Sequence, residues 1–290
     1  MATLKELRNK IAVIESTRKV TSAMKLVAGV KLRKAEQKTT SSREYSHELN
    51  AMLSKLRRDF VDIESELFNG KKHVETVLLI VFASDRGLCG NFNHLINKVV
   101  AFIVEDLHDK GKKVKIICVG NKLVEHCKKF MKNDDSIEVI KNFYRNADTY
   151  EESKALANKV ISYFKDGTVD RVSVVYTKYY SVMSRKVEFR DIIPLSYEEN
   201  EDKTITVFEP DAKKVLDELL PYNVAIQIYQ CALESIASEQ SSRMTSMDNA
   251  TRNADSLLSE SKVKYNRIRQ TKITQELMEV ISGAKAIAEG

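Results

Sequence analysis

The most constraining feature of this sequence is the near absence of helix breakers from both of its ends. Residues 222–282 contain neither glycine nor proline, and residues 1–69 contain one glycine, Gly29. Ordinary helices run about 11 to 12 residues, so these two stretches predict two unusually long helices. At ~1.5 Å per residue the second would be on the order of 90 Å long, which no compact domain of this size would enclose.

Both stretches carry apolar residues at helical spacing. The first opens with spacings of three, four and three, as in a coiled coil: Leu4, Leu7, Ile11 and Ile14. The second has a comparable series: Val224, Ile228, Cys231, Ile236, Met244, Met247, Ala250 and Ala254. A long helix must bury its apolar stripe, so we predict that the two terminal helices pair as an antiparallel coiled coil. Packing in an ordinary helix bundle is the alternative.

The middle of the chain has a different pattern. Three runs are rich in β-formers, at residues 74–85, 113–120 and 171–181, and helix-like segments separate them. Strands that alternate with helices indicate an α/β unit with parallel strands. Residues 186–195 alternate apolar and polar side chains, which is typical of an antiparallel edge strand.

We therefore expect an α/β fold combined with a long α-helical coiled coil, in which a Rossmann-like domain is inserted between the terminal helices. The expected parts are an N-terminal helix over 1–60, a central domain over 72–195, and a C-terminal helix over 208–290 that pairs with 1–60.

A loop with two glycines follows the first predicted strand, which is the usual position of a phosphate-binding loop. Its sequence, "SDRGLCGN" at 84–91, lacks both the Gly-Lys-Ser/Thr of a Walker loop and the GxGxxG of a dinucleotide site. The two glycines therefore indicate a tight turn rather than a cofactor site. Cys89 is not expected to act as a nucleophile, since no histidine lies within four residues of it in the sequence.

Other chemical patterns are weak. Cys118 and Cys127 lack the spacing of metal ligands, and His94, His108 and His126 are isolated. We expect no catalytic residue, no cofactor and no metal. Residues 1–40 hold ten Lys or Arg against three Glu, but no aromatic residues alternate with these charges as in nucleic-acid-binding segments. The basic helix therefore favours a solvated face or an acidic protein partner over nucleic acid.

Targeting signals are also missing from the sequence. The start, "MATLKELRNK", lacks a signal-peptide core, and no apolar run approaches the ~18 residues that span a bilayer. Four cysteines without a CxxC pair are typical of a reducing compartment. We expect a soluble protein without direct membrane insertion, whose association with a membrane, if any, is through partners.

Several separated motifs resemble the gamma subunits of F-type ATP synthases, and the resemblance covers the whole chain. "KITQELMEVISGAKA" (272–286) is similar to the C-terminal signature of that family, and "YNRIRQ" (265–270) precedes it, with Thr271 where alanine is usual. Three further stretches resemble other family motifs: 17–35, 84–93 and 237–254. The order of the motifs is that of the family.

The resemblance implies a rotor shaft inside a ring of alternating α and β subunits. It implies contacts to that ring at Met24, Lys25, Arg33, Lys34, Arg243, Arg269, Gln270, Thr274 and Glu276. It implies an apolar bearing tip at Val280, Ile281, Ala284, Ile287 and Ala288, and a foot toward the membrane ring at Phe208 and Glu209. The alternative for the polar residues is a solvated face with local pairs, such as Lys272 with Glu276.

The resemblance also implies further partners and a location. Besides the α and β subunits these are the epsilon subunit and the c-ring of the membrane. The chain would not hydrolyse ATP itself. It would lie peripherally on the cytoplasmic side of a bacterial inner membrane, within the ATP synthase complex. The cysteine-bearing redox insertion of chloroplast relatives is absent. A nucleotide-dependent enzyme and a nucleic-acid adaptor are the rival functions.

Overall fold

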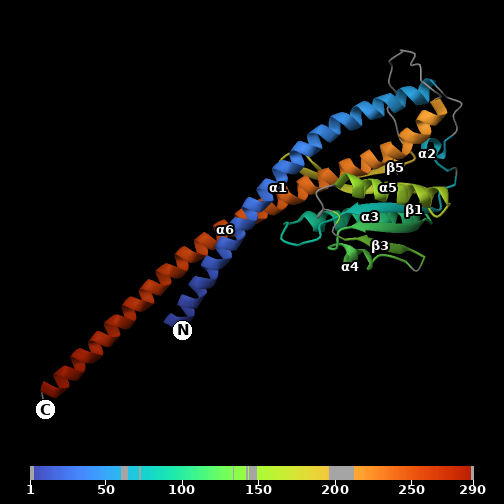
Figure 1. Ribbon diagram of the computed structural model, residues 1–290. Coiled ribbons are helices and arrows are strands. Elements are labelled where there is room, and N and C mark those ends of the chain that lie inside the picture. Colours follow the sequence, from blue (N-terminus) through green and yellow to red (C-terminus); the bar gives the residue numbers. More distant parts are fainter. Residues whose placement is uncertain are drawn as a thin grey trace. The chain divides into compact units, whose positions relative to one another are not determined.

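The computed structural model of the chain describes residues 3–59, 65–71, 73–132, 134–141, 143, 149–195 and 212–288 (Figure 1). The chain divides into two compact units: Met1–Val27 with Met244–Gly290, and Ala28–Arg243. Two long helices, α1 (Leu4–Asp59) and α6 (Ala212–Ala288), contribute residues to both units. Each unit is described separately below.

The first unit is a pair of antiparallel helical segments. Glu15 pairs with Lys262 at 3.2 Å, Arg18 with Asp255 at 3.1 Å, and the hydroxyls of Thr21 and Thr251 are 2.8 Å apart. As the residue numbers increase along α1, the numbers of their partners on α6 decrease, so the two segments run antiparallel. The buried side chains of α6 in this unit follow coiled-coil spacings of seven, four and three: Met247, Ala254, Leu258 and Ser261.

The second unit contains a five-stranded sheet in the order β3-β2-β1-β4-β5. β1 (Thr76–Phe82), β2 (Lys113–Val119), β3 (Ser136–Ile140) and β4 (Arg171–Tyr179) are parallel, and β5 (Arg185–Ile193) pairs antiparallel to β4. Four helices lie in the connections: α2 (Glu66–Asn69), α3 (Phe92–Asp109), α4 (Val124–Cys127) and α5 (Thr149–Lys165).

The two faces of this sheet support separate cores. Alternate residues of β1 point to opposite faces, so Leu78, Ile80 and Phe82 pack with α5 and with the segments of α1 and α6 in this unit. Val77, Leu79 and Val81 pack instead with α3 and α4. Burial on both faces explains why this strand is a continuous apolar run rather than an alternating one.

Helix α6 completes the hydrogen bonding of β4. β1 pairs with β4 only as far as Val175, and buried backbone groups beyond that point need other partners. The N–H of Thr177 donates to Ser235 Oγ at 3.2 Å, and the N–H of Tyr179 donates to Glu234 Oε2 at 2.8 Å. Arg43 of α1 donates to the other oxygen of Glu234 at 2.7 Å. Glu234 therefore joins α1, α6 and the sheet.

Because α6 is covered on several sides here, its burial has no helical period. Every residue from Cys231 to Arg243 except Ile236 is buried. A helix buried all round is normally apolar, but this one is rich in small polar residues: Ser235, Ser238, Ser241 and Ser242. Small side chains allow close approach, and the hydroxyls of Ser238 and Ser241 donate to the carbonyls of Thr177 and Val182.

The predicted fold class is confirmed, with two differences in detail. The short strand β3 was not predicted, because its five residues (136–140) offer little pattern. The C-terminal helix begins at Ala212, four residues after the predicted start at 208, and Pro221 lies inside it as the predicted span implied. A proline costs a helix interior about 3 kcal/mol. Burial of Leu216, Leu220 and Val224 along one face offsets this cost.

Asp170 fastens the start of β1 through hydrogen bonds to its backbone. Its carboxylate accepts the N–H groups of Glu75 and Thr76 at 2.9 and 3.0 Å and lies 3.2 Å from Lys71 Nζ. Burial alone would raise the pKa of Asp170, but the two N–H donors and the Lys71 ammonium together lower it. We expect Asp170→Asn to cost about 1–3 kcal/mol in the free energy of unfolding at pH 7.

The sign of the pH dependence follows from the lowered pKa. The contribution of Asp170 is present above its ordinary pKa of 3.8, and it is lost as the pH falls through the lower value of the folded state. Urea unfolding between pH 7 and pH 3 should show the stability of the unsubstituted chain falling toward that of Asp170→Asn. The exposed Asp166 is the matched control, and Asp166→Asn should change stability by less than about 0.5 kcal/mol. Equal losses in the two variants would contradict the assignment.

Candidate contact surfaces

The C-terminal end of α6 is exposed along its length. It extends beyond the N-terminus of α1 (Figure 1), and every side chain described from Arg269 to Lys285 is exposed. Five large apolar side chains in this span are about half exposed or more: Ile273, Leu277, Met278, Val280 and Ile281. The exposed fraction of Val280 is 70%. Contiguous exposed apolar side chains mark an interaction surface.

The predicted bearing tip lies on this end. Val280, Ile281 and Ala284 are exposed, and nothing within 4 Å would meet a Cβ at Gly283. The side chains of Ile287 and Ala288 lie outside the described residues, as do Phe208 and Glu209 of the predicted foot.

The predicted polar contacts lie on the same end of α6. Arg269, Gln270, Thr274 and Glu276 are all exposed. The Thr274 hydroxyl donates to the carbonyl of Gln270 at 2.9 Å, so it is satisfied by its own helix. Lys272 lies 3.7 Å from Glu276, which is the local pair expected from their spacing. Exposed pairs of this kind contribute little to stability, so these charges remain available to a partner.

The basic residues predicted on α1 divide into two kinds. Arg33 and Lys34 are exposed. Met24 is half-buried, and Lys25 donates to Asp248 at 2.6 Å. That carboxylate also accepts from Arg252 at 2.9 Å, and the hydrogen bond from Lys25 lowers the pKa of Asp248. Lys25 thus fastens α1 to α6, whereas Arg33 and Lys34 present their charge to solvent.

A row of exposed valines lies on α1, and none of them was among the residues predicted to contact the ring of α and β subunits. Val13, Val20 and Val27 are 64%, 54% and 56% exposed. Their spacing of seven places them on one line of the helix, away from the buried Leu7 and the Thr21 that contacts α6. The signal was present in the sequence, since the three valines repeat with the period of the buried stripe. Burial decides which of the two stripes faces the partner helix.

Arg243 has a different environment from the other predicted contact residues. Its side chain is only 11% exposed and lies 2.5 Å from Glu239 Oε1. It also donates to the carbonyls of Arg86 and Gly87 at 3.2 and 3.3 Å. The neighbouring Ser242 donates to the carbonyl of Cys89 at 2.6 Å. Arg243 and Ser242 therefore fasten α6 to loop 84–91.

These contacts also show the role of the glycine-containing loop. Phosphate loops turn backbone N–H groups toward their ligand, whereas loop 84–91 turns three carbonyl oxygens toward α6. Leu88 and Gly90 adopt positive φ angles of 63° and 59° within it. The geometry is that of an acceptor for a guanidinium group, in agreement with the structural interpretation of these glycines.

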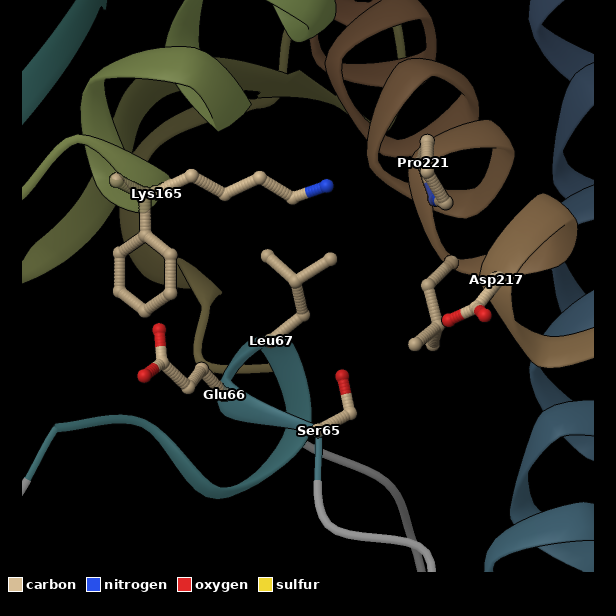
Figure 2. A pocket seen from close by; sticks show the side chains of 8 residues that line it. Ser65, Glu66, Leu67, Lys165, Asp217 and Pro221 are labelled. Atoms are coloured by element: carbon tan, nitrogen blue, oxygen red, sulfur yellow. The ribbon is translucent and has the colours of Figure 1, made fainter. Parts of the chain in front are cut away.

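A small cavity of about 250 Å³ lies between α2, the end of α5 and the start of α6. Figure 2 shows Lys165 reaching toward the space between Leu67 and Pro221. Its volume is below the ~300–1,000 Å³ of ordinary ligand pockets. Within the part of the chain that the structure describes, no three His, Cys, Asp or Glu side chains are placed to hold a metal.

Length and apolarity decide whether a helix can span a membrane. Although α6 has 77 residues, charges recur throughout it. No described helix has a segment both long enough and apolar enough to cross a bilayer.

Comparison with solved structures shows which other proteins share this fold. The rotor of the mitochondrial ATP synthase of Euglena gracilis contains a chain that matches 93% of this one, with 98% of its own length covered, a TM-score of 0.60 and 15% identity. A chain of the central stalk and c-ring of the Tetrahymena thermophila enzyme matches 80%, with 99% of its own length covered, a TM-score of 0.54 and 22% identity. This chain shares with them its fold, an α/β domain inserted between two long helices.

Sequence comparison identifies the family. The family model described as ATP synthase matches residues 3–287. The ATP synthase gamma chain of Pelagibacter ubique is 39% identical over 292 residues, which cover 99% of this chain and all of the relative. That of Paramagnetospirillum magneticum is 38% identical over 295 residues, with the same coverage. The chain belongs to the ATP synthase gamma chain family, as its motifs predicted.

Proposed function

We propose that this chain is the central rotor shaft of an F-type ATP synthase and that it couples ion flow through a membrane ring to ATP synthesis or hydrolysis. The observation that carries the proposal is the exposed end of α6, where every described side chain from Arg269 to Lys285 is open to solvent. Ile273, Leu277 and Val280 form an exposed apolar row on this end, and such a row marks a surface that a partner covers.

The proposed mechanism is conformational rather than chemical. The α and β subunits surround the shaft and meet a different face of it at each orientation. A ligand that interacts differently with two conformations shifts the population between them. A shaft with an apolar row on one side and charges on another would likewise shift the conformation of each subunit it faces. Near the tip, uncharged side chains such as Val280 and Ile281 leave few ion pairs to break as it turns.

The partners follow from the two ends of the chain. The helical end would contact the α and β subunits through Met24, Arg33, Lys34, Arg269, Gln270, Thr274 and Glu276, with Lys25 and Arg243 mainly supporting the helix. The α/β domain and the foot segment would contact the epsilon subunit and the c-ring. With these partners the chain would lie peripherally on the cytoplasmic side of a bacterial inner membrane. The chain itself would be non-catalytic.

Reconstitution tests the proposal. The full chain is mixed with the α and β subunits, and complex formation and ATPase activity are measured with and without it. We expect a stable complex whose turnover depends on the chain, and no ATP binding by the isolated chain in calorimetry. A mixture equally active without the chain would refute the proposal, and ATP hydrolysis by the isolated chain would favour an enzyme.

A double substitution on α6 gives a finer prediction. Arg269→Ala with Gln270→Ala removes two exposed side chains whose loss leaves no buried group unpaired. We expect turnover of the reconstituted complex to fall about fivefold, which corresponds to ~1 kcal/mol, with unchanged helical content by circular dichroism. Lys264→Ala, an exposed change about one and a half turns earlier on α6, is the control and should leave turnover unchanged. Loss of helix in the double variant would instead assign these residues to folding.

A further inference from the structure

The α/β domain contains two cysteines whose side chains meet although they are nine positions apart. Cys118 lies near the end of β2 and Cys127 at the end of α4, and their sulfur atoms are 3.9 Å apart. Both side chains are fully buried. The other two cysteines have different neighbours: Asn93 Nδ2 lies 3.3 Å from Cys89 Sγ, and Arg190 Nη2 lies 3.3 Å from Cys231 Sγ.

The two thiols are chemically unequal. The Cys118 thiol donates a hydrogen bond to Cys127 Sγ. This bond lowers the pKa of the Cys127 thiol, against the raising effect of burial, and it raises the pKa of Cys118 together with burial. Only a thiolate is a nucleophile toward an oxidant. Cys127 is therefore the attacking group and Cys118 the resolving group.

The distance to a covalent bond is short. A disulfide has an S–S length near 2.05 Å, so the sulfurs need to approach by about 1.9 Å. The element that moves is small, because α4 is a single turn from Val124 to Cys127. A local opening of this single turn, which requires less free energy than global unfolding, would admit a small oxidant to the buried pair.

We propose that Cys118 and Cys127 are a redox modification site, which a hydroperoxide converts into a disulfide that links β2 to α4. With hydrogen peroxide, the Cys127 thiolate attacks one oxygen and expels hydroxide, which takes up the thiol proton as water, and Cys127 becomes a sulfenic acid. The Cys118 thiol then gives its proton to the sulfenic hydroxyl, and its sulfur attacks Cys127 Sγ as the thiolate. The S–O bond breaks, the S–S bond forms, and a second water leaves. Two thiols and one peroxide thus give one disulfide and two waters.

Peptide mapping of the full chain tests this site. The chain is treated with hydrogen peroxide, free thiols are alkylated after denaturation, and the protein is digested with trypsin. Lys122 separates the two cysteines, so a disulfide joins peptides 116–122 and 123–128. We expect this linked pair, two hydrogens lighter than the sum of its free peptides, with Cys89 and Cys231 still alkylated. Alkylation of Cys118 and Cys127 to the same extent as the other two, or separate oxidation to sulfinic acids, would overturn the proposal.

Two variants and a second measurement sharpen the test. Cys127→Ala should abolish the linked peptides, whereas Cys89→Ala, a matched change of a buried cysteine outside the pair, should retain them. Hydrogen exchange of the unsubstituted chain should slow across residues 120–127 after oxidation and recover with dithiothreitol. Unchanged exchange in oxidised chain that carries the linked peptides would overturn the fastening of α4 to β2.

Discussion

Gly120→Ala is expected to lower the free energy of unfolding by roughly 3–5 kcal/mol, through backbone strain and overpacking together. Gly120 follows β2 and has a φ of +105°, a region that L side chains rarely adopt. A Cβ there would lie 2.3 Å from the carbonyl oxygen of Ala83. The obstruction is backbone at the end of β1, which cannot rotate away as a side chain would.

Gly111→Ala is the matched control for this substitution. Gly111 also has a positive φ, +70°, but nothing within 4 Å would meet its Cβ. We expect a loss of about 1 kcal/mol from strain alone. Urea unfolding of both variants separates the two causes. Equal losses would show that the end of β1 yields to the new methyl group. That result would contradict close packing between the end of β1 and Gly120.

Arg243→Ala is expected to cost about 3–5 kcal/mol, because it leaves the buried carboxylate of Glu239 without its partner. The substitution also removes the donors to two carbonyls of loop 84–91. Arg252→Ala is the control, since Arg252 makes an ion pair of the same i, i+4 spacing with Asp248 but is 77% exposed. That change should cost less than about 1 kcal/mol.

The pH dependence gives this prediction a sign. Burial raises the pKa of Glu239 above its ordinary 4.5, against the lowering effect of Arg243. Without Arg243 the pKa rises further, so ionised Glu239 destabilises the variant increasingly as the pH climbs above 4.5. The stability deficit of Arg243→Ala should therefore be smaller near pH 4.5 than at pH 8. A deficit that grows toward acid pH would contradict this origin.

The sequence predicted the elements of the fold better than the environment of its polar residues. Long helices follow from the absence of breakers, and β1 follows from an apolar run, because both signals are local. Strand β3 is short and half-buried, and Pro221 is tolerated through packing that no local pattern records. The burial of Glu234, Glu239 and Arg243 depends on loop 84–91 and β4, which are distant in the sequence.

The candidate contacts show the same division. The spacing of Lys272 and Glu276 was enough to predict their pairing, and the family resemblance was enough to predict an apolar stripe that includes Val280 and Ile281. Whether such a stripe is covered depends on where α1 begins, which is a property of the paired helices. Arg243 was predicted as a contact by its motif, and its contact with partner subunits stays a prediction. The structure adds its role in fastening α6 to the loop.

The central claim, that this chain acts by turning, is tested most directly by watching single molecules. All four native cysteines are buried, so Met183→Cys, at a position 84% exposed between β4 and β5, offers a thiol for selective attachment of a bead. With the α and β subunits fixed to a surface, we predict that ATP drives the bead in continuous rotation of one sense. A bead that stays still while the same complexes hydrolyse ATP would contradict the account.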